Sequence, residues 1–120
     1  MKLSDQVCSL EIAKRLKELG VTQNTLFYWC SPAPSHGRDD WEIRTSYDSH
    51  AKENYSAYTC SELGEMLPIE YLSLRLDGGQ WKCVSSNPAL DFTFQATEAD
   101  ARGKMLIYLL EQGIINASEV

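Results

Sequence analysis

Two histidines and two aspartates lie within a short stretch of the chain, and their types could carry out chemistry. They are His36, Asp39, Asp40 and His50. Imidazole nitrogens and carboxylate oxygens bind divalent metals, and a histidine beside an aspartate can transfer protons as a general acid or base. The alternative is a solvated loop, because exposed loops are polar whether or not they bind anything. We favour the solvated loop, since such spacing is weak evidence for a site.

The rest of the chain lacks the short motifs of the common enzyme classes. It has no phosphate-binding loop, no dinucleotide fingerprint, no nucleophile elbow and no HExxH zinc motif. Cys8, Cys30, Cys60 and Cys83 are widely spaced and include no Cys-x-x-Cys pair, which argues against a zinc site and a disulfide scaffold. We therefore expect reduced thiols that fill the core, no cofactor and no enzymatic activity.

A group of aromatic residues could instead form an interface with another protein. It comprises Trp41, Tyr47, Tyr55 and Tyr58. Tryptophan and tyrosine are enriched among the residues that dominate the binding energy of protein interfaces. The alternative is that these rings cover the edge of a sheet, since aromatic residues commonly fill small cores. The sequence leaves both interpretations open.

The charge of the chain excludes some partners. The net charge is −6, and residues 39–70 alone carry eight acids and two bases. An acidic chain repels phosphate backbones, so we expect no binding to nucleic acid. No stretch approaches the roughly 20 apolar residues of a membrane span, and no apolar signal core follows the first residues. We therefore expect a cytoplasmic protein without a membrane partner.

Three helices are predicted from their caps. Ser9, Thr59 and Thr97 can each accept a hydrogen bond from the first turn of a helix that follows. Glu62 lies three residues after Thr59, and this pair predicts a capping box. The predicted helices cover residues 10–19, 60–67 and 98–112.

Strands are predicted where apolar and polar residues alternate. The Asp77-Gly78 pair between two such runs predicts a tight hairpin, and short connections favour antiparallel pairing. Residues 46–58 have no clear period and are interpreted as a loop, with a short strand near residues 55–58 as an option. We predict a single α+β domain over residues 1–120, in which an antiparallel sheet of four to five strands packs with three helices in the order α-β-β-α-β-β-β-α. The predicted strands cover residues 25–30, 41–45, 71–76, 80–84 and 92–96.

The last helix has an unusual apolar segment. Residues 105–110 are apolar without interruption, and one helix face cannot hold six consecutive residues. We therefore expect this helix to pack on two sides, against the sheet and against either another helix or a second subunit. The second outcome would give a homodimer through the C-terminal helix. Gly103 in the same helix indicates close backbone packing, because glycine weakens a helix by about 1 kcal/mol relative to alanine.

Four segments, at residues 11–20, 26–29, 62–68 and 97–110, carry a resemblance to known proteins. They resemble small uncharacterised proteins that are encoded by phages and mobile elements of Bacteroides-type gut bacteria. The last of these segments, over residues 97–110, is the most specific, and the resemblance covers about two-thirds of the chain. It implies no activity, cofactor or catalytic residue. The chain is also similar to the phage ABA sandwich domains, which implies a sheet layered between helices.

These observations predict a non-enzymatic accessory protein of a phage or mobile element that acts through protein–protein interaction. The partner is a protein that the sequence does not identify. The alternative is a small metal-assisted hydrolase that uses the two histidines and two aspartates. A third interpretation is an acidic decoy, which would block a nucleic-acid-binding protein by presenting a DNA-like charge field.

Overall fold

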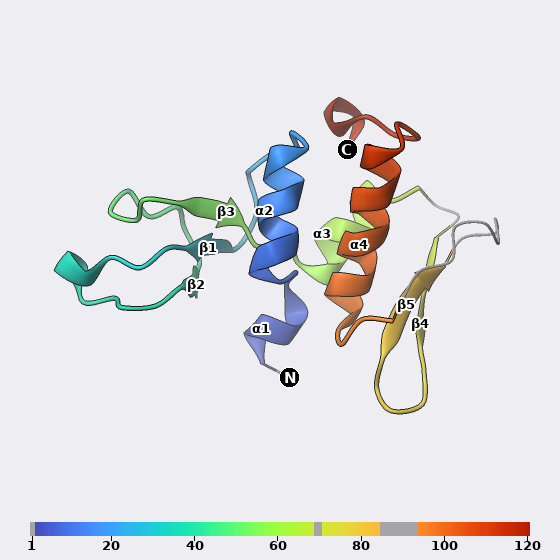
Figure 1. Ribbon diagram of the computed structural model, residues 1–120, viewed down its shortest axis with the longest axis horizontal. Coiled ribbons are helices and arrows are strands. Elements are labelled where there is room, and N and C mark those ends of the chain that lie inside the picture. Colours follow the sequence, from blue (N-terminus) through green and yellow to red (C-terminus); the bar gives the residue numbers. More distant parts are fainter. Residues whose placement is uncertain (1, 69–70, 85–93) are drawn as a thin grey trace.

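The computed structural model describes residues 2–68, 71–84 and 94–120 of the chain. Its longer helices lie between two antiparallel sheets, one on each side of the helical layer (Figure 1). The predicted α+β class is therefore confirmed. The molecule is flat, with extents of 49 × 35 × 18 Å.

The three predicted helices form, and their caps account for where they begin. Ser9 Oγ accepts a hydrogen bond from Ile12 N, and Thr97 Oγ1 accepts one from Asp100 N. Thr59 and Glu62 make the predicted capping box. A short helix at the N-terminus was not predicted. The α-helices of the described residues are α1 (Leu3–Gln6), α2 (Leu10–Glu18), α3 (Cys60–Met66) and α4 (Glu98–Glu111).

The strands divide between two sheets, whereas one sheet of four to five strands was predicted. The first sheet has the order β2-β1-β3, and the second is the β4-β5 hairpin. The predicted strand over residues 92–96 lies partly outside the described residues, although Gln95 exchanges two backbone hydrogen bonds with Trp81, at 2.8 and 2.7 Å. The strands are β1 (Tyr28–Cys30), β2 (Glu42–Arg44), β3 (Asn54–Ser56), β4 (Leu72–Arg75) and β5 (Trp81–Val84).

Side chains that close the outer edge of β3 explain this division. Ser56 N donates to Gln23 Oε1 at 2.8 Å, and Lys17 Nζ donates to the Asn54 carbonyl at 3.2 Å. An edge strand can pair with a further strand only when the N–H and C=O groups on its outer side are free. Because polar side chains of helix α2 and the segment after it already occupy these groups, β3 ends the first sheet.

Helix α4 is the centre of the core. It packs against β5 on one side and against α2 and α3 on the others. The predicted two-sided packing is therefore met by elements of the same chain. The apolar segment of α4 no longer requires a second subunit, and the homodimer through this helix stays a prediction. None of the helices in the described part of the chain is long and apolar enough to cross a membrane. The buried residues of α4 are Ala99, Ala101, Gly103, Met105, Leu106, Ile107 and Leu109.

Gly103 sits where α4 approaches α2, as predicted. A Cβ atom at this position would lie 2.7 Å from Ile12 Cγ2, which is closer than van der Waals contact. We expect Gly103→Ala to lower the free energy of unfolding by about 1 kcal/mol, because overpacking costs about 1–3 kcal/mol and the gain in helix propensity returns about 1 kcal/mol. Urea unfolding measures this difference.

A double-mutant cycle with Ile12→Ala is the control for that prediction. Ile12→Ala removes the Cγ2 atom that the new methyl group would meet. The cost of Gly103→Ala should therefore disappear in the Ile12→Ala background. Additive costs of the two substitutions would contradict the close contact.

Candidate functional site

Tyr58 does not belong to an exposed aromatic surface, which is one of the two interpretations that the sequence leaves open for it. The side chain is 2 % exposed and lies in the core cluster. Its Oη donates to the Thr22 carbonyl at 2.6 Å and accepts from Gln23 Nε2 at 2.9 Å. Burial raises the pKa of this phenol above its ordinary value, so it stays a neutral hydrogen-bonding group. Tyr58 follows β3 and points into the helical layer, where its size contributes to stability.

Trp41 and Tyr55, by contrast, lie together. Their ring centroids are 6.1 Å apart, with planes tilted by 33°, and both residues are half-buried. Tyr55 is on β3 directly opposite Trp29 of β1, and its Oη donates to Glu53 Oε1 at 3.0 Å. Trp41 immediately precedes β2. The first sheet therefore brings two rings from distant parts of the sequence into one partly exposed pair.

Two lysines of α2 cover this ring pair. Lys14 Nζ is 5.1 Å from the Trp41 ring and 5.8 Å from the Tyr55 ring, and Lys17 Nζ is 5.0 Å from the Tyr55 ring. Ammonium groups within about 6 Å of an aromatic face are attracted by its negative quadrupole. We call Trp41, Tyr55, Lys14 and Lys17 the aromatic–lysine surface.

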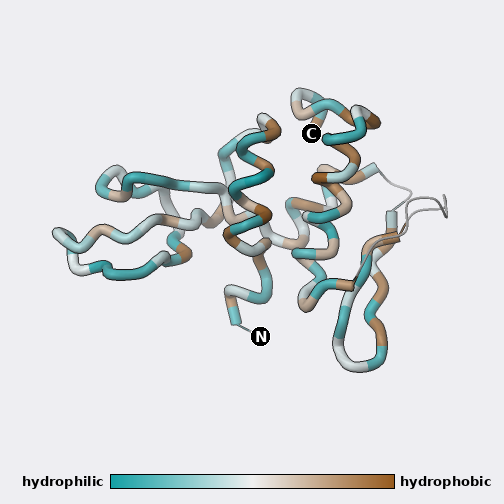
Figure 2. The backbone as a smooth tube through the Cα atoms, in the orientation of Figure 1, coloured by the Kyte–Doolittle hydropathy of each residue, from teal (hydrophilic) through white to brown (hydrophobic). Residues whose placement is uncertain are grey.

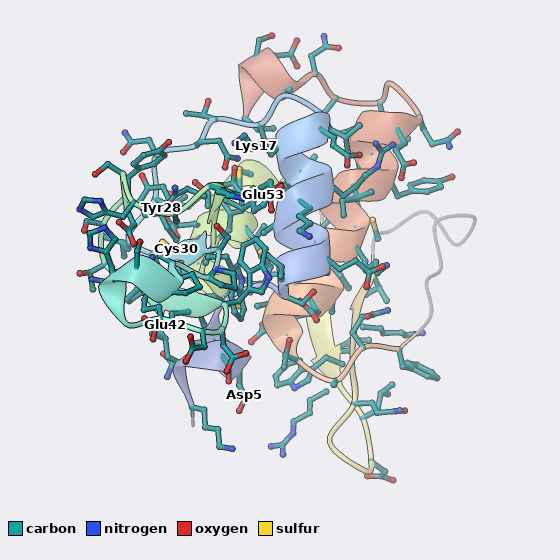
Figure 3. All side chains as sticks on the ribbon, turned by 60° about the vertical axis from the view of Figure 1, so that its left-hand side comes forward. Asp5, Lys17, Tyr28, Cys30, Glu42 and Glu53 are labelled. Atoms are coloured by element: carbon teal, nitrogen blue, oxygen red, sulfur yellow. The ribbon has the colours of Figure 1, made fainter. Side chains whose placement is uncertain are left out.

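The two lysines were missed as site residues in the sequence. Their spacing of three residues places them on one face of α2. Figure 3 shows Lys17 and Glu53 beside each other where the first sheet meets α2. The signal that could have pointed to them is the combination of two basic residues at helical spacing with the acidic, aromatic segment over residues 39–58.

Tyr47 lies apart from the aromatic–lysine surface. It is 66 % exposed, and its ring packs edge-on against Tyr28 at 6.3 Å. Neighbouring residues of a strand face opposite sides of the sheet, so Tyr28 and Trp29 of β1 point to different faces. Because Trp29 pairs with Tyr55, Tyr47 belongs to the other face of the sheet. The four predicted aromatics are thus divided among the core and two surfaces.

Exposed carboxylates neighbour the two rings of the aromatic–lysine surface along the chain. Figure 2 shows that the loops joining the strands of the first sheet are largely hydrophilic. These loops and strands carry half of the net charge of −6 of residues 39–70. The exposed acids that adjoin Trp41 or Tyr55 are Asp39, Asp40, Glu42 and Glu53.

The four residues predicted as an alternative metal site do not form one. His36 and His50 do meet, with ring centroids 3.8 Å apart and planes within 26° of parallel. Stacked rings direct their in-plane nitrogen lone pairs side by side instead of toward one point. Within the described ranges, no group of three or more His, Cys, Asp or Glu side chains could hold a metal ion. Asp39 and Asp40 are exposed and do not complete the pair.

Asp48 is the acid that joins the β1–β2 loop to the β2–β3 loop. It forms an ion pair with Arg38, and the side chains of both residues are about nine-tenths buried. Asn54 holds the same loop, since its Nδ2 donates to the Asp48 carbonyl and its Oδ1 accepts from Asp48 N, both at 2.9 Å. The thiol of Cys30 also donates to Asn54 Oδ1, at 3.1 Å. This network fixes the loops against β1 and has a structural role.

The Asp48 ion pair predicts a pH-dependent stability. A hydrogen bond from His50 N, together with the Arg38 guanidinium, holds the pKa of the Asp48 carboxyl below its ordinary value. A depressed pKa stabilises the folded state above the unfolded pKa of about 3.9, and this contribution is lost as the pH falls through the folded value. Urea unfolding should therefore find Asp48→Asn less stable than the wild type at pH 7.

The difference should shrink as the pH falls below about 4, because the wild-type carboxyl is then protonated as well. Asp39→Asn is the matched control, since Asp39 is exposed and forms no ion pair among the described residues. A stability difference for Asp48→Asn that is the same at pH 7 and pH 3 would contradict this role of the ion pair.

The cysteines are not activated nucleophiles. Desolvation raises the pKa of the Cys8 thiol to about 12 and those of Cys60 and Cys83 to about 11, and it also raises the pKa of Cys30. All four are free, and Cys8, Cys30 and Cys83 are buried, as predicted for thiols that fill the core. Because the thiolate is the reactive form, these groups are inert at neutral pH.

Comparison of the chain with protein-family models, with curated proteins and with solved structures gives no match. The relationship to proteins of Bacteroides-type bacteria and their phages, expected from the sequence, therefore stays a prediction.

Proposed function

We propose that the chain is a non-enzymatic accessory protein that binds another protein through the aromatic–lysine surface. The observation that carries this proposal is the pairing of Trp41 and Tyr55 at the margin of the core, where both are half-buried and lysines of α2 lie over them. Rings that are already ordered lose little conformational entropy when a partner packs on them, which is why such residues dominate interfaces.

The charges around this surface indicate the chemistry of the partner. Glu42 is adjacent to Ile43, which is in register with Trp29, so Glu42 lies on the opposite face of the sheet from Tyr55. The other three exposed acids, Asp39, Asp40 and Glu53, outnumber the two lysines that lie over the rings. A partner with a basic segment would pair with these carboxylates and would be steered to the rings by the negative field. Nucleic-acid-binding proteins present basic surfaces, and the decoy interpretation names such a protein as the partner. A cytoplasmic location and an origin in a phage or mobile element are parts of the same proposal and depend on the sequence alone.

Affinity capture with matched variants tests the proposal. The tagged wild type is compared with a Trp41→Ser, Tyr55→Ser double variant in cell lysate, and Tyr47→Ser is the control on the opposite face of the sheet. We expect a basic protein that the wild type and Tyr47→Ser retain and that the double variant loses. Circular dichroism establishes that each variant is folded.

A second variant keeps the test independent of the rings. Asp39→Asn with Asp40→Asn changes two exposed side chains, so the fold should be unaffected. It should weaken capture of the same protein, and added salt should weaken capture by the wild type. Equal capture by the wild type and both variants would contradict the proposal.

A further inference from the structure

We infer that a second site, the cleft between the β4–β5 hairpin and the first turns of α3 and α4, binds a small aromatic anion. The cleft has a volume of about 440 Å³ and is open to solvent. Ligand sites commonly have volumes of about 300–1,000 Å³, an apolar lining and a few directed polar groups. Residues that line this cleft include Thr59, Cys60, Arg75, Trp81, Thr97 and Glu98.

The register of the hairpin explains why Arg75 and Trp81 face the cleft together. They are directly opposite each other, as are Ser73 and Cys83 two residues further along. Side chains two residues apart on a strand share one face of the sheet. Ser73 accepts a hydrogen bond from Arg102 of α4, and Cys83 is buried in the core, so this face is turned toward α4.

The hairpin extends past the start of α4, and this leaves part of its inner face uncovered. Figure 1 shows the hairpin turn projecting beyond the first turn of the helix. Arg75 and Trp81 are the pair of that face nearest to the turn, which contains Gly78 and Gly79. The result is a ring surface beside a cation at the open end of the helical layer.

The charges of the cleft favour an anion at the Arg75 end. Arg75 is exposed, and within the described part of the chain its guanidinium makes no ion pair or hydrogen bond. Glu98, an acid of the lining, is already paired with Arg102 at 3.1 Å. Asp5 lines the α1 side of the cleft, so the anionic group of a ligand would avoid that end. A guanidinium binds a carboxylate through two parallel hydrogen bonds.

Two hydroxyl groups add donors to the same cleft. Thr59 Oγ1 and Thr97 Oγ1 accept hydrogen bonds from Glu62 N and Asp100 N, each at 3.1 Å. Each hydroxyl proton is still available to donate to a ligand oxygen. The Cys60 thiol in the lining stays protonated because desolvation raises its pKa to about 11. The protonated Cys60 thiol is not a nucleophile, so the cleft is suited to binding a ligand and not to reacting with it.

A ligand that satisfies these groups carries a planar apolar ring and a carboxylate. The ring would stack on Trp81, beside the apolar side chains of Ala96 and Ala99, and the carboxylate would meet Arg75. This site uses none of the residues of the aromatic–lysine surface, so it is independent of the proposed protein interaction.

Nuclear magnetic resonance titration with 2-naphthoate, 2-naphthamide and acetate tests this inference on the full chain. Naphthoate should shift the indole N–H signal of Trp81 and the amide signals of residues 75–81 and 96–99. The neutral amide and the ringless acetate should each bind at least about tenfold more weakly, because each lacks one of the two required groups.

Variants at an exposed position keep the test free of folding effects. Arg75→Gln should weaken naphthoate binding about tenfold or more, whereas Arg75→Lys should retain part of it. Arg44→Gln, an exposed arginine of the first sheet that is paired with Glu42, is the matched control and should bind as the wild type does. Equal binding of naphthoate by Arg75→Gln, equal binding of naphthamide, or shifts confined to other residues would each overturn the inference.

Discussion

Replacing Tyr58 with alanine is expected to lower the free energy of unfolding by about 3–5 kcal/mol, the range for large aromatic side chains removed from a core. The phenol is 2 % exposed and packs among the helices, so its removal leaves a cavity that the surrounding backbone cannot close. Urea unfolding monitored by circular dichroism measures the loss. Such a variant would also lose any partner by unfolding, which makes it unsuitable as an interface variant.

Tyr58→Phe separates the hydroxyl from the ring. It should cost about 1–2 kcal/mol, because the Thr22 carbonyl and Gln23 Nε2 would each lose a partner. Tyr47→Ala is the surface control and should change stability by less than about 0.5 kcal/mol. If Tyr58→Ala were as mild as Tyr47→Ala, Tyr58 could not occupy the core.

Replacing Arg102 with alanine is expected to cost about 2–4 kcal/mol, since the side chain joins three elements of the structure. Its guanidinium donates to the Cys60 carbonyl at 2.7 Å, to Ser73 Oγ at 2.9 Å and to Glu98 at 3.1 Å. Hydrogen bonds to a charged group contribute about 1.5–3 kcal/mol each, and the loss is not additive. Urea unfolding again provides the measurement.

Two further variants test whether this loss comes from the joint itself. Gly64→Ala should destabilise the protein less than Arg102→Ala does, because the new Cβ would displace only the Nη1 end of the Arg102 side chain and the gain in helix propensity returns about 1 kcal/mol. Arg15→Ala should have a much smaller effect, since the ion pairs of Arg15 with Glu18 and Glu111 are exposed. Comparable losses for Arg15→Ala and Arg102→Ala would contradict the special role of the Arg102 joint.

The elements that could be predicted from the sequence are those with local signals. The caps Ser9, Thr59 and Thr97 bond to atoms three residues away, so their pattern is visible in the chain. The β4–β5 hairpin follows from the Asp77-Gly78 turn, and Gly78 has the expected positive φ of 87°. These features need no knowledge of tertiary contacts.

The division into two sheets depends on contacts that no local pattern encodes. Gln23 and Lys17 close the edge of β3 across 33 and 37 residues. In β3 itself the usual polarity is reversed, because Asn54 and Ser56 are buried while Tyr55 is half-exposed. The alternation of apolar and polar residues predicts the reverse, with Tyr55 on the buried face of β3 and the two polar residues on the exposed face.

The candidate site shows the same limit. Tyr58 and Tyr55 are three residues apart and of one type, yet one fills the core and the other lies on the surface. The acid that holds the β1–β2 and β2–β3 loops is Asp48, because Asn54 pairs with its backbone and brings it to Arg38. In both cases tertiary contacts determine which residue has the role. Residue type alone selects Asp39, Asp40 and the four aromatics as candidates.

The most direct test of the proposed protein interaction is hydrogen exchange of the chain in complex with the basic protein that it captures. We expect exchange to slow at the amides of residues 39–44 and 53–56 and in the helix turn that holds Lys14 and Lys17. Exchange near Tyr47 and in the β4–β5 hairpin should not change. Protection confined to the hairpin, or to the Tyr28–Tyr47 face, would contradict binding through the aromatic–lysine surface.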